Sequence, residues 1–133
     1  MKNTNQQPLK DSIRNLEKAI ARLEEAITIS PDNSIAVDGT IQRFEFVIEL
    51  SWKMLKRALA LEGIEAKTPR EAMTEAYKAK WIDNENLWLS MLKDRNETSH
   101  IYDEKKALEI YLRIKTSYAG ELRRILEFIK GRM

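Results

Sequence analysis

The sequence predicts an all-α protein in which residues 1–133 form a single domain, an up-and-down bundle of about five helices. Apolar residues recur at helical spacing along most of the chain. Only four Gly and three Pro interrupt it, and no segment alternates apolar and polar residues as a half-exposed strand does. A chain of 133 residues is long enough to bury one sizeable core.

The first helix is predicted between residues 9 and 27. Its apolar residues are three or four positions apart, which places them on one stripe of a helix: Leu9, Ile13, Leu16, Ile20, Leu23 and Ile27. Ser30-Pro31 should end it, because the residue before Pro is pushed out of the helical region. Polar residues 1–8 are expected to be disordered.

The second helix is predicted over residues 35–61. Its apolar residues cover more than one stripe, so we expect this helix at the centre of the bundle, buried on two sides. The same surplus of apolar surface predicts a homodimer, in which a second copy covers part of the helix. Gly63 is a natural stop after it.

A third, short helix is predicted to begin at Thr68-Pro69-Arg70-Glu71. Thr68 is the N-cap, Pro69 takes the first helical position and Glu71 the capping-box position. We expect this helix to lie across one end of the bundle. Asp83 is the predicted cap of a fourth helix, and Asp103 of a fifth whose apolar stripe extends to Ile129.

Composition excludes several classes of protein. A formal net charge of +2 argues against a broad duplex-binding surface but leaves room for a local RNA-binding cleft. The absence of Cys excludes disulfides and thiolate metal sites. Paired metal-binding His residues and a Gly-rich phosphate loop are also missing, so no metal or cofactor is expected. Without an apolar run of eighteen residues or a signal peptide, we expect a cytoplasmic protein with no membrane span.

The segment from Lys93 to Tyr102 (KDRNETSHIY) carries the candidate chemistry. His100 is the only histidine and falls between two predicted helices. Arg95 lies four residues after Met91, which turns it toward the apolar side of its helix. His moves protons near neutral pH, Arg binds phosphate, and Asn96 can orient both. Metal-independent RNA cleavage needs little more, because the 2′-hydroxyl of RNA is the nucleophile.

Structural interpretations of these residues stand beside the catalytic one, and on spacing alone they come first. A single His at a helix end is usually a capping or surface residue. An inward Arg usually forms a structural ion pair, here with Asp94, Glu97 or Glu45. Arg95 and His100 would point about 140° apart on one continuous helix, so they can share a ligand only if the helix ends between them.

Two further residues are supporting candidates. Glu45 occupies a semi-buried position of the second helix, where it can pair with Arg95 or poise His100, or be an ordinary surface glutamate. Lys53 belongs to a basic strip after Trp52 that a solvated helix face explains equally well.

The stretch from Arg95 to Tyr102 matches the R-N-x-x-x-H-x-Y signature of HEPN domains. Segments 41–46, 50–53, 68–71 and 87–96 resemble one branch of that superfamily, the nucleotidyltransferase substrate-binding protein family, relatives of the HepT toxins. The resemblance covers residues 13–128 and keeps every signature position.

This resemblance implies a helical homodimer with two signature motifs in one cleft and a small nucleotidyltransferase as partner. It implies a metal-independent endoribonuclease toxin in which Arg95 and His100 are catalytic and Asn96 is supportive. Tyr102 would be the residue that the partner adenylylates to neutralise the toxin. The alternative is a non-catalytic subunit that docks the transferase and presents a nucleotide or another substrate.

Overall fold

The computed structural model describes residues 6–98 and 103–133, and throughout these ranges it is helical with no strand. The elements are α1 (Gln7–Ala26), α2 (Ser34–Leu61), α3 (Pro69–Lys78), α4 (Glu85–Thr98), α5 (Glu104–Arg113), a π-helical segment η1 (Ile114–Tyr118) and α6 (Ala119–Gly131). The all-α prediction is confirmed. The first helix begins at Gln7, two residues before Leu9, with Pro8 in its first turn.

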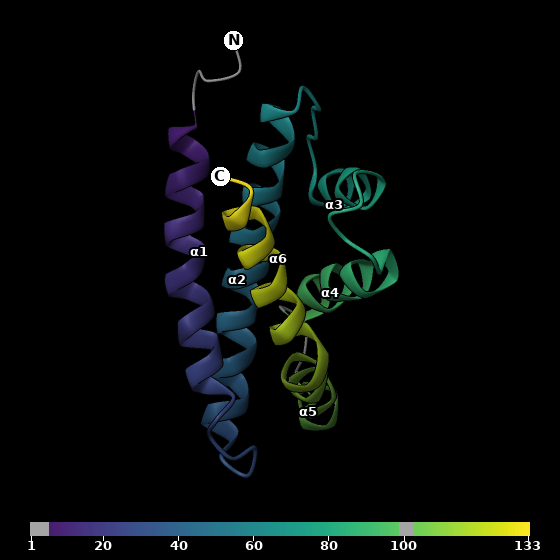
Figure 1. Cartoon of the computed structure of the whole chain (residues 1–133). Coiled ribbons are helices and arrows are strands. Elements are labelled where there is room, and N and C mark those ends of the chain that lie inside the picture. The colour runs from purple at the N-terminus through teal and green to yellow at the C-terminus, as the bar shows by residue number, and fades with distance from the viewer. Residues whose placement is uncertain (1–5, 99–102) are drawn as a thin grey trace.

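The long helix α2 lies at the centre of the molecule, as its apolar pattern predicted. It packs against α1, α3, α4, α5 and α6. Figure 1 shows α1 running beside it and α6 crossing in front of it. The residues of α2 that form the middle of the core are almost completely inaccessible to solvent: Phe44, Val47, Ile48, Met54, Leu55 and Leu59.

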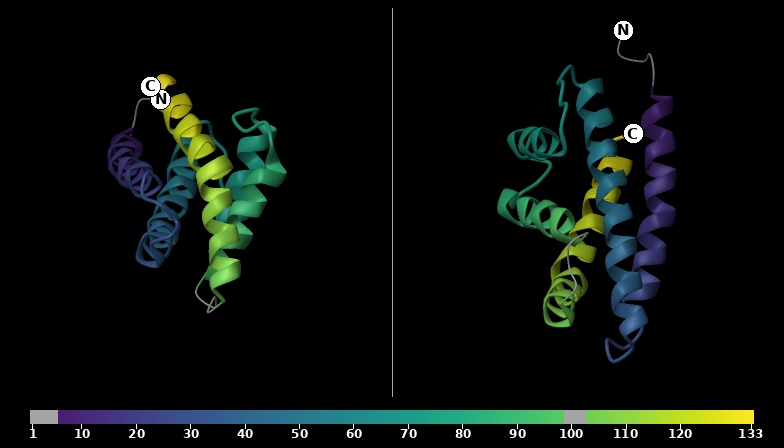
Figure 2. Two further views of the ribbon diagram at one scale, coloured as in Figure 1. Left: turned by 90° about the horizontal axis from the view of Figure 1, so that it is seen from below. Right: turned by 180° about the vertical axis from the view of Figure 1, so that it is seen from behind.

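The short helices α3 and α4 lie across α2 along its side, so α3 does not close one end of the bundle as expected (Figure 2). The predicted capping box of α3 is present. Thr68 Oγ1 accepts a hydrogen bond from the Glu71 N–H at 3.1 Å, and Glu71 Oε1 accepts one from the Lys67 N–H at 2.8 Å. These bonds fix the start of α3.

Most of the other helix ends also follow the sequence signals. Asp103 caps α5 through the Lys105 N–H, and Gly63 adopts a φ of 80° directly after α2, a conformation that glycine adopts without strain. The expectation that Asp83 caps the fourth helix is wrong. Asn84 Oδ1 accepts the Leu87 N–H at 3.0 Å, because α4 begins one residue later, at Glu85.

The predicted fifth helix is not one regular α-helix. Residues 114–118 form a π-helical turn, closed by the Ala119 N–H donating to the carbonyl of Ile114. Thr116 Oγ1 donates to the Leu112 carbonyl at 2.7 Å beside this turn. Tyr111 and Tyr118 are buried, as expected from the apolar stripe.

Candidate functional site

The candidate residues lie at and beyond the C-terminal turn of α4. Arg95 and Asn96 belong to α4, which ends at Thr98. His100 and Tyr102 lie outside the described residues, so the place of His100 between two helices and the role of Tyr102 as the modified residue stay predictions. The described part of the site is therefore the contact between the C-terminal turns of α4 and the neighbouring face of α2.

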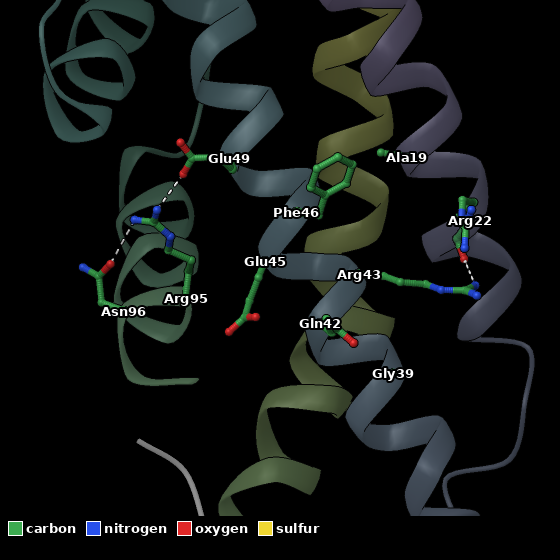
Figure 3. A pocket seen from close by; sticks show the side chains of 10 residues that line it. All are labelled: Ala19, Arg22, Gly39, Gln42, Arg43, Glu45, Phe46, Glu49, Arg95 and Asn96. Carbon is green, nitrogen blue, oxygen red and sulfur yellow. Dashed lines mark hydrogen bonds and ion pairs between the residues drawn. The ribbon is translucent and has the colours of Figure 1, made fainter. Parts of the chain in front are cut away.

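An open groove of about 1060 Å³ lies next to this wall, on a face of α2 between α1 and α4 (Figure 3). Its lining comes from α1 (Ala19 and Arg22), α2 (Gly39, Gln42, Arg43, Glu45, Phe46 and Glu49) and α4 (Arg95 and Asn96). Arg43 reaches across to α1, where its Nη1 donates to the Arg22 carbonyl at 2.6 Å. The groove thus places charged side chains of both signs around an exposed aromatic ring, that of Phe46.

Arg95 points into the groove from the α4 side. Its Nη2 donates to Glu49 Oε1 at 2.6 Å, and its Nη1 donates to Asn96 Oδ1 at 3.2 Å. The sequence suggested Asp94, Glu97 and Glu45 as possible partners but not Glu49. Glu49 was missed because the sequence does not reveal which turn of α2 faces α4. About a third of each side chain of the pair is exposed, so an incoming anion can compete with Glu49 for the guanidinium.

The two supporting candidates occupy different places. Glu45 lines the groove half-buried, and this burial raises the pKa of its carboxyl, while the positive charge of Arg95 opposes the rise. Lys53 is exposed on α2 and pairs with Glu49 at 3.4 Å, four residues before it. Lys53 and Arg95 thus pair with the same carboxylate, that of Glu49. Lys53 itself does not line the groove.

The structure adds a buried network behind Arg95 that sequence reasoning missed. The Asp94 side chain is 6% exposed, and Arg113 binds its carboxylate bidentately through Nε at 2.8 Å and Nη2 at 3.0 Å. The Tyr118 hydroxyl donates to Asp94 Oδ2 at 2.5 Å. The only signal in the sequence was the position of Asp94, three residues after Met91 and six after Trp88, which places it on the inner side of α4. Its partners come from the π-helical region, which helical periodicity does not predict.

No group of three or more His, Cys, Asp or Glu side chains in residues 6–98 and 103–133 could hold a metal ion. In the same part of the chain, none of the helices has the length and apolar character needed to cross a membrane.

The chain was compared with protein families, curated proteins and solved structures. Residues 11–131 match the family described as "Nucleotidyltransferase substrate binding protein like". A protein of Haemophilus influenzae (strain Rd) named "Probable ribonuclease HepT" is 34% identical over 108 residues, 74% of either chain.

Two solved structures are similar over almost the whole chain. One, from Thermus thermophilus, has a TM-score of 0.75 at 32% identity and covers 88% of this chain and 97% of that one. The other, from Haemophilus influenzae, is described as revealing the fold of a substrate binding domain of a nucleotidyltransferase. It has a TM-score of 0.65 at 30% identity and covers 95% of this chain and 99% of that one. These matches confirm the resemblance seen in the sequence, and the chain belongs to the nucleotidyltransferase substrate-binding protein-like family of helical HEPN proteins.

Proposed function

We propose that this protein is a metal-independent endoribonuclease, the toxin of a toxin–antitoxin pair, and that a partner nucleotidyltransferase neutralises it. The observation that carries the proposal is the placement of Arg95, whose guanidinium enters an open groove at the end of α4. Five residues later in the chain comes His100, the only histidine. The name of the Haemophilus influenzae relative supports the same activity.

In the proposed reaction, the 2′-oxygen of RNA attacks the adjacent phosphorus. The bond from phosphorus to the 5′-oxygen breaks, and the leaving oxygen takes up a proton. Arg95 exchanges Glu49 for the non-bridging oxygens of the phosphate, and Asn96 helps to hold the guanidinium. His100 accepts the proton of the 2′-hydroxyl and returns a proton to the leaving 5′-oxygen.

The proposed working unit is a homodimer formed through the groove face. Phe46 is 60% exposed there, on a helix whose other side forms the core. Burying the exposed part of this ring against a second copy would contribute about 1–2 kcal/mol. A two-fold axis close to Phe46 would bring the two copies of Arg95 to one cleft, because Arg95 lines the same groove.

The proposed neutralisation is nucleotidyl transfer to Tyr102. Its phenolic oxygen attacks the α-phosphorus of ATP and pyrophosphate leaves, so Tyr102 carries AMP. The added phosphate would pair with Arg95 and compete with the phosphate of RNA, and the bulky nucleotide would block the groove.

Intact mass after incubation with the cognate nucleotidyltransferase and ATP tests this step. Tyr102→Phe should abolish the added mass, whereas Tyr77→Phe, which changes an exposed tyrosine of α3, should not.

The second candidate function is a non-catalytic subunit that presents a nucleotide or another substrate to the transferase. The description of the Haemophilus influenzae structure as a substrate binding domain favours it. The same groove would then hold the substrate, with Arg95 on its phosphate. Both candidates involve a nucleotidyltransferase, so a transferase complex alone does not distinguish them.

Incubating the purified protein with RNA in the presence of EDTA separates the two functions. We expect cleavage by the native protein, no cleavage of 2′-O-methyl RNA because the nucleophile is blocked, and loss of cleavage in His100→Ala. If the native protein leaves RNA intact while binding nucleotide, or if His100→Ala cleaves at the native rate, the ribonuclease mechanism is wrong.

A further inference from the structure

The carboxylate of Asp94 is the most completely buried charged group among the described residues. Only 4% of the residue is exposed, and it accepts three hydrogen bonds, two from Arg113 and one from Tyr118. Taking a carboxylate out of water is costly even when it is paired, and apolar side chains often stabilise such a position equally well. Beyond stability, the network fixes the position of the C-terminal turns of α4, which carry Asp94.

The hydroxyl of Tyr118 holds two consecutive turns of α4. It lies 2.5 Å from Asp94 Oδ2 and 2.7 Å from Ser90 Oγ, and these two residues are four apart on α4. The Tyr118 ring is itself stacked on Phe44 of α2, with ring centroids 5.4 Å apart. Burial raises the pKa of the Tyr118 phenol, so the hydroxyl keeps the proton that it donates to Asp94.

The π-helical turn explains how Arg113 and Tyr118 reach the same carboxylate. Residues five apart point about 140° apart on an α-helix, so one of the two would face away. Hydrogen bonding from residue i to i+5, as between Ile114 and Ala119, brings residues five apart onto neighbouring turns of one side. The extra residue in this turn therefore serves the contact with α4, in keeping with the frequent occurrence of π-bulges at functional sites.

Arg95, the next residue after Asp94, projects to the other side of α4, where Glu49 of α2 receives it. The last turns of α4 are thus held from both sides, by the Asp94 clamp (Asp94, Arg113, Tyr118 and Ser90) and by α2. Of the two, the Glu49 contact must be released when Arg95 binds a phosphate. The clamp residues are not part of the groove lining, so the clamp remains in place during this exchange.

We propose that the Asp94 clamp positions Arg95: by fixing the C-terminal turns of α4, it holds the guanidinium in the groove when Glu49 is exchanged for substrate. This inference rests on the proposed function for the role of Arg95. The clamp touches neither substrate nor the reacting atoms, so its residues are positioning residues. A misplacement of the order of 1 Å can cost about a hundredfold in rate, so the loss of one clamp contact should be measurable.

Tyr118→Phe tests the clamp, with Tyr111→Phe as the matched control. Both tyrosines are fully buried between Glu104 and Gly131. Tyr118→Phe removes the hydroxyl hydrogen bonds to Asp94 and Ser90, and Tyr111→Phe removes the one to the Ile29 carbonyl at 3.1 Å, away from Arg95. RNA cleavage is measured at a temperature at which both variants are fully folded. We expect kcat to fall about tenfold in Tyr118→Phe, with KM little changed, and the Tyr111→Phe enzyme to stay within twofold of the native one.

A double-mutant cycle shows whether the effect passes through Arg95. In an Arg95→Ala background, Tyr118→Phe should cause no further loss of kcat, because the residue that it positions is gone. An equal loss of kcat in Tyr111→Phe and Tyr118→Phe, or a full additional loss in the Arg95→Ala background, would overturn the proposal.

A readout without activity keeps the clamp separate from the ribonuclease proposal. In ¹⁵N-labelled protein, the Arg95 Nε–Hε signal is assigned by its absence in Arg95→Ala. Tyr118→Phe should shift or broaden that signal and Tyr111→Phe should leave it unchanged. If the native protein does not cleave RNA but this NMR pattern is found, the proposed function fails and the clamp stands. If the Arg95 signal is the same in both variants, the clamp fails whatever the activity.

Discussion

Asp94 and Arg95 are neighbours in the chain, yet two different kinds of ion pair hold them. The Asp94 carboxylate is buried and gripped bidentately by Arg113, with the Tyr118 hydroxyl as a third donor. Arg95 contacts Glu49 at 2.6 Å, and about a third of each of these two side chains meets solvent. The first pair can be broken only by leaving a buried charge without a partner, whereas the second can exchange its partner at little cost.

The two ion pairs therefore have different roles: one fixes the end of α4, and the other leaves Arg95 available to a ligand. A helix that turns one charged residue inward and the next one outward keeps its end fixed while the outer residue remains available to a ligand. The inner pair should therefore dominate the free energy of unfolding, and the outer pair should dominate activity. Substitutions in the two regions test that division.

The largest expected effect on activity is the loss of RNA cleavage in Arg95→Ala. Removing the only guanidinium that α4 contributes to the groove should lower kcat by about 10²–10³-fold, as loss of one group that stabilises transition-state charge does. Lys93→Ala removes an equal charge from an exposed position of α4 and should cleave at the native rate. In thermal melts, the Tm of Arg95→Ala should be close to that of the native protein. A large fall in Tm would show that the role of Arg95 is structural.

The next effect concerns the open face on which the outer pair lies. Phe46→Asp places a charge at the centre of the proposed dimer contact. Because the dimer is two-fold symmetric, both copies carry the substitution at the interface. At about 2 kcal/mol for each copy, the dimer dissociation constant should rise about a thousandfold. Sedimentation velocity measures this. Tyr77→Asp, an exposed aromatic residue on α3, is the control and should leave the dimer intact. A native protein that is monomeric at tens of micromolar contradicts the prediction directly.

Equilibrium unfolding should reverse the order of the two ion pairs. Asp94→Asn leaves Arg113 without its carboxylate and should cost about 2–3 kcal/mol, somewhat below the range for fully buried pairs, because the Arg113 side chain is 44% exposed. Glu49→Gln breaks the Arg95 pair in the same way and should cost less than about 1 kcal/mol. Urea denaturation of the two variants in parallel decides this, and equal losses would remove the distinction drawn between the pairs.

The smallest effect is a pH dependence at Glu45, within the groove. Burial raises the pKa of the Glu45 carboxyl above its unfolded value, and Arg95 opposes this only in part. A carboxyl with a raised folded-state pKa contributes stability that is present below its unfolded pKa and lost as the pH rises through the folded pKa.

Glu45→Gln should therefore be more stable than the native protein at pH 7, with the gap closing toward about pH 3. Unfolding free energies across this range measure it, with Glu65→Gln at an exposed loop position as the control. A variant that is less stable than the native protein at pH 7 would show that the attraction to Arg95 outweighs burial.

Local signals were sufficient for most of the fold. Apolar periodicity predicts α1 and the central place of α2, and the capping box at Thr68 predicts the start of α3, because these features depend on residues within a few positions of one another. The same locality explains the error at Asp83. Two adjacent residues that are both good caps differ only in where the helix starts, and packing decides that.

By itself, the sequence determined the helical class, the family resemblance and the segment that carries the candidate chemistry, with Arg95 and Asn96 at the end of a helix. Only the tertiary structure decided that Arg95 forms its ion pair with Glu49, four residues after the Glu45 that the sequence offered, and that Lys53 pairs with the same Glu49. It also decided the π-helical turn that brings Arg113 and Tyr118 onto Asp94. The contacts of Asp94 with Arg113 and Tyr118, and of Arg95 with Glu49, join residues 19 to 46 positions apart. Their geometry depends on how two helices are rotated against each other, a quantity that the packing of the whole core sets and that no local periodicity contains.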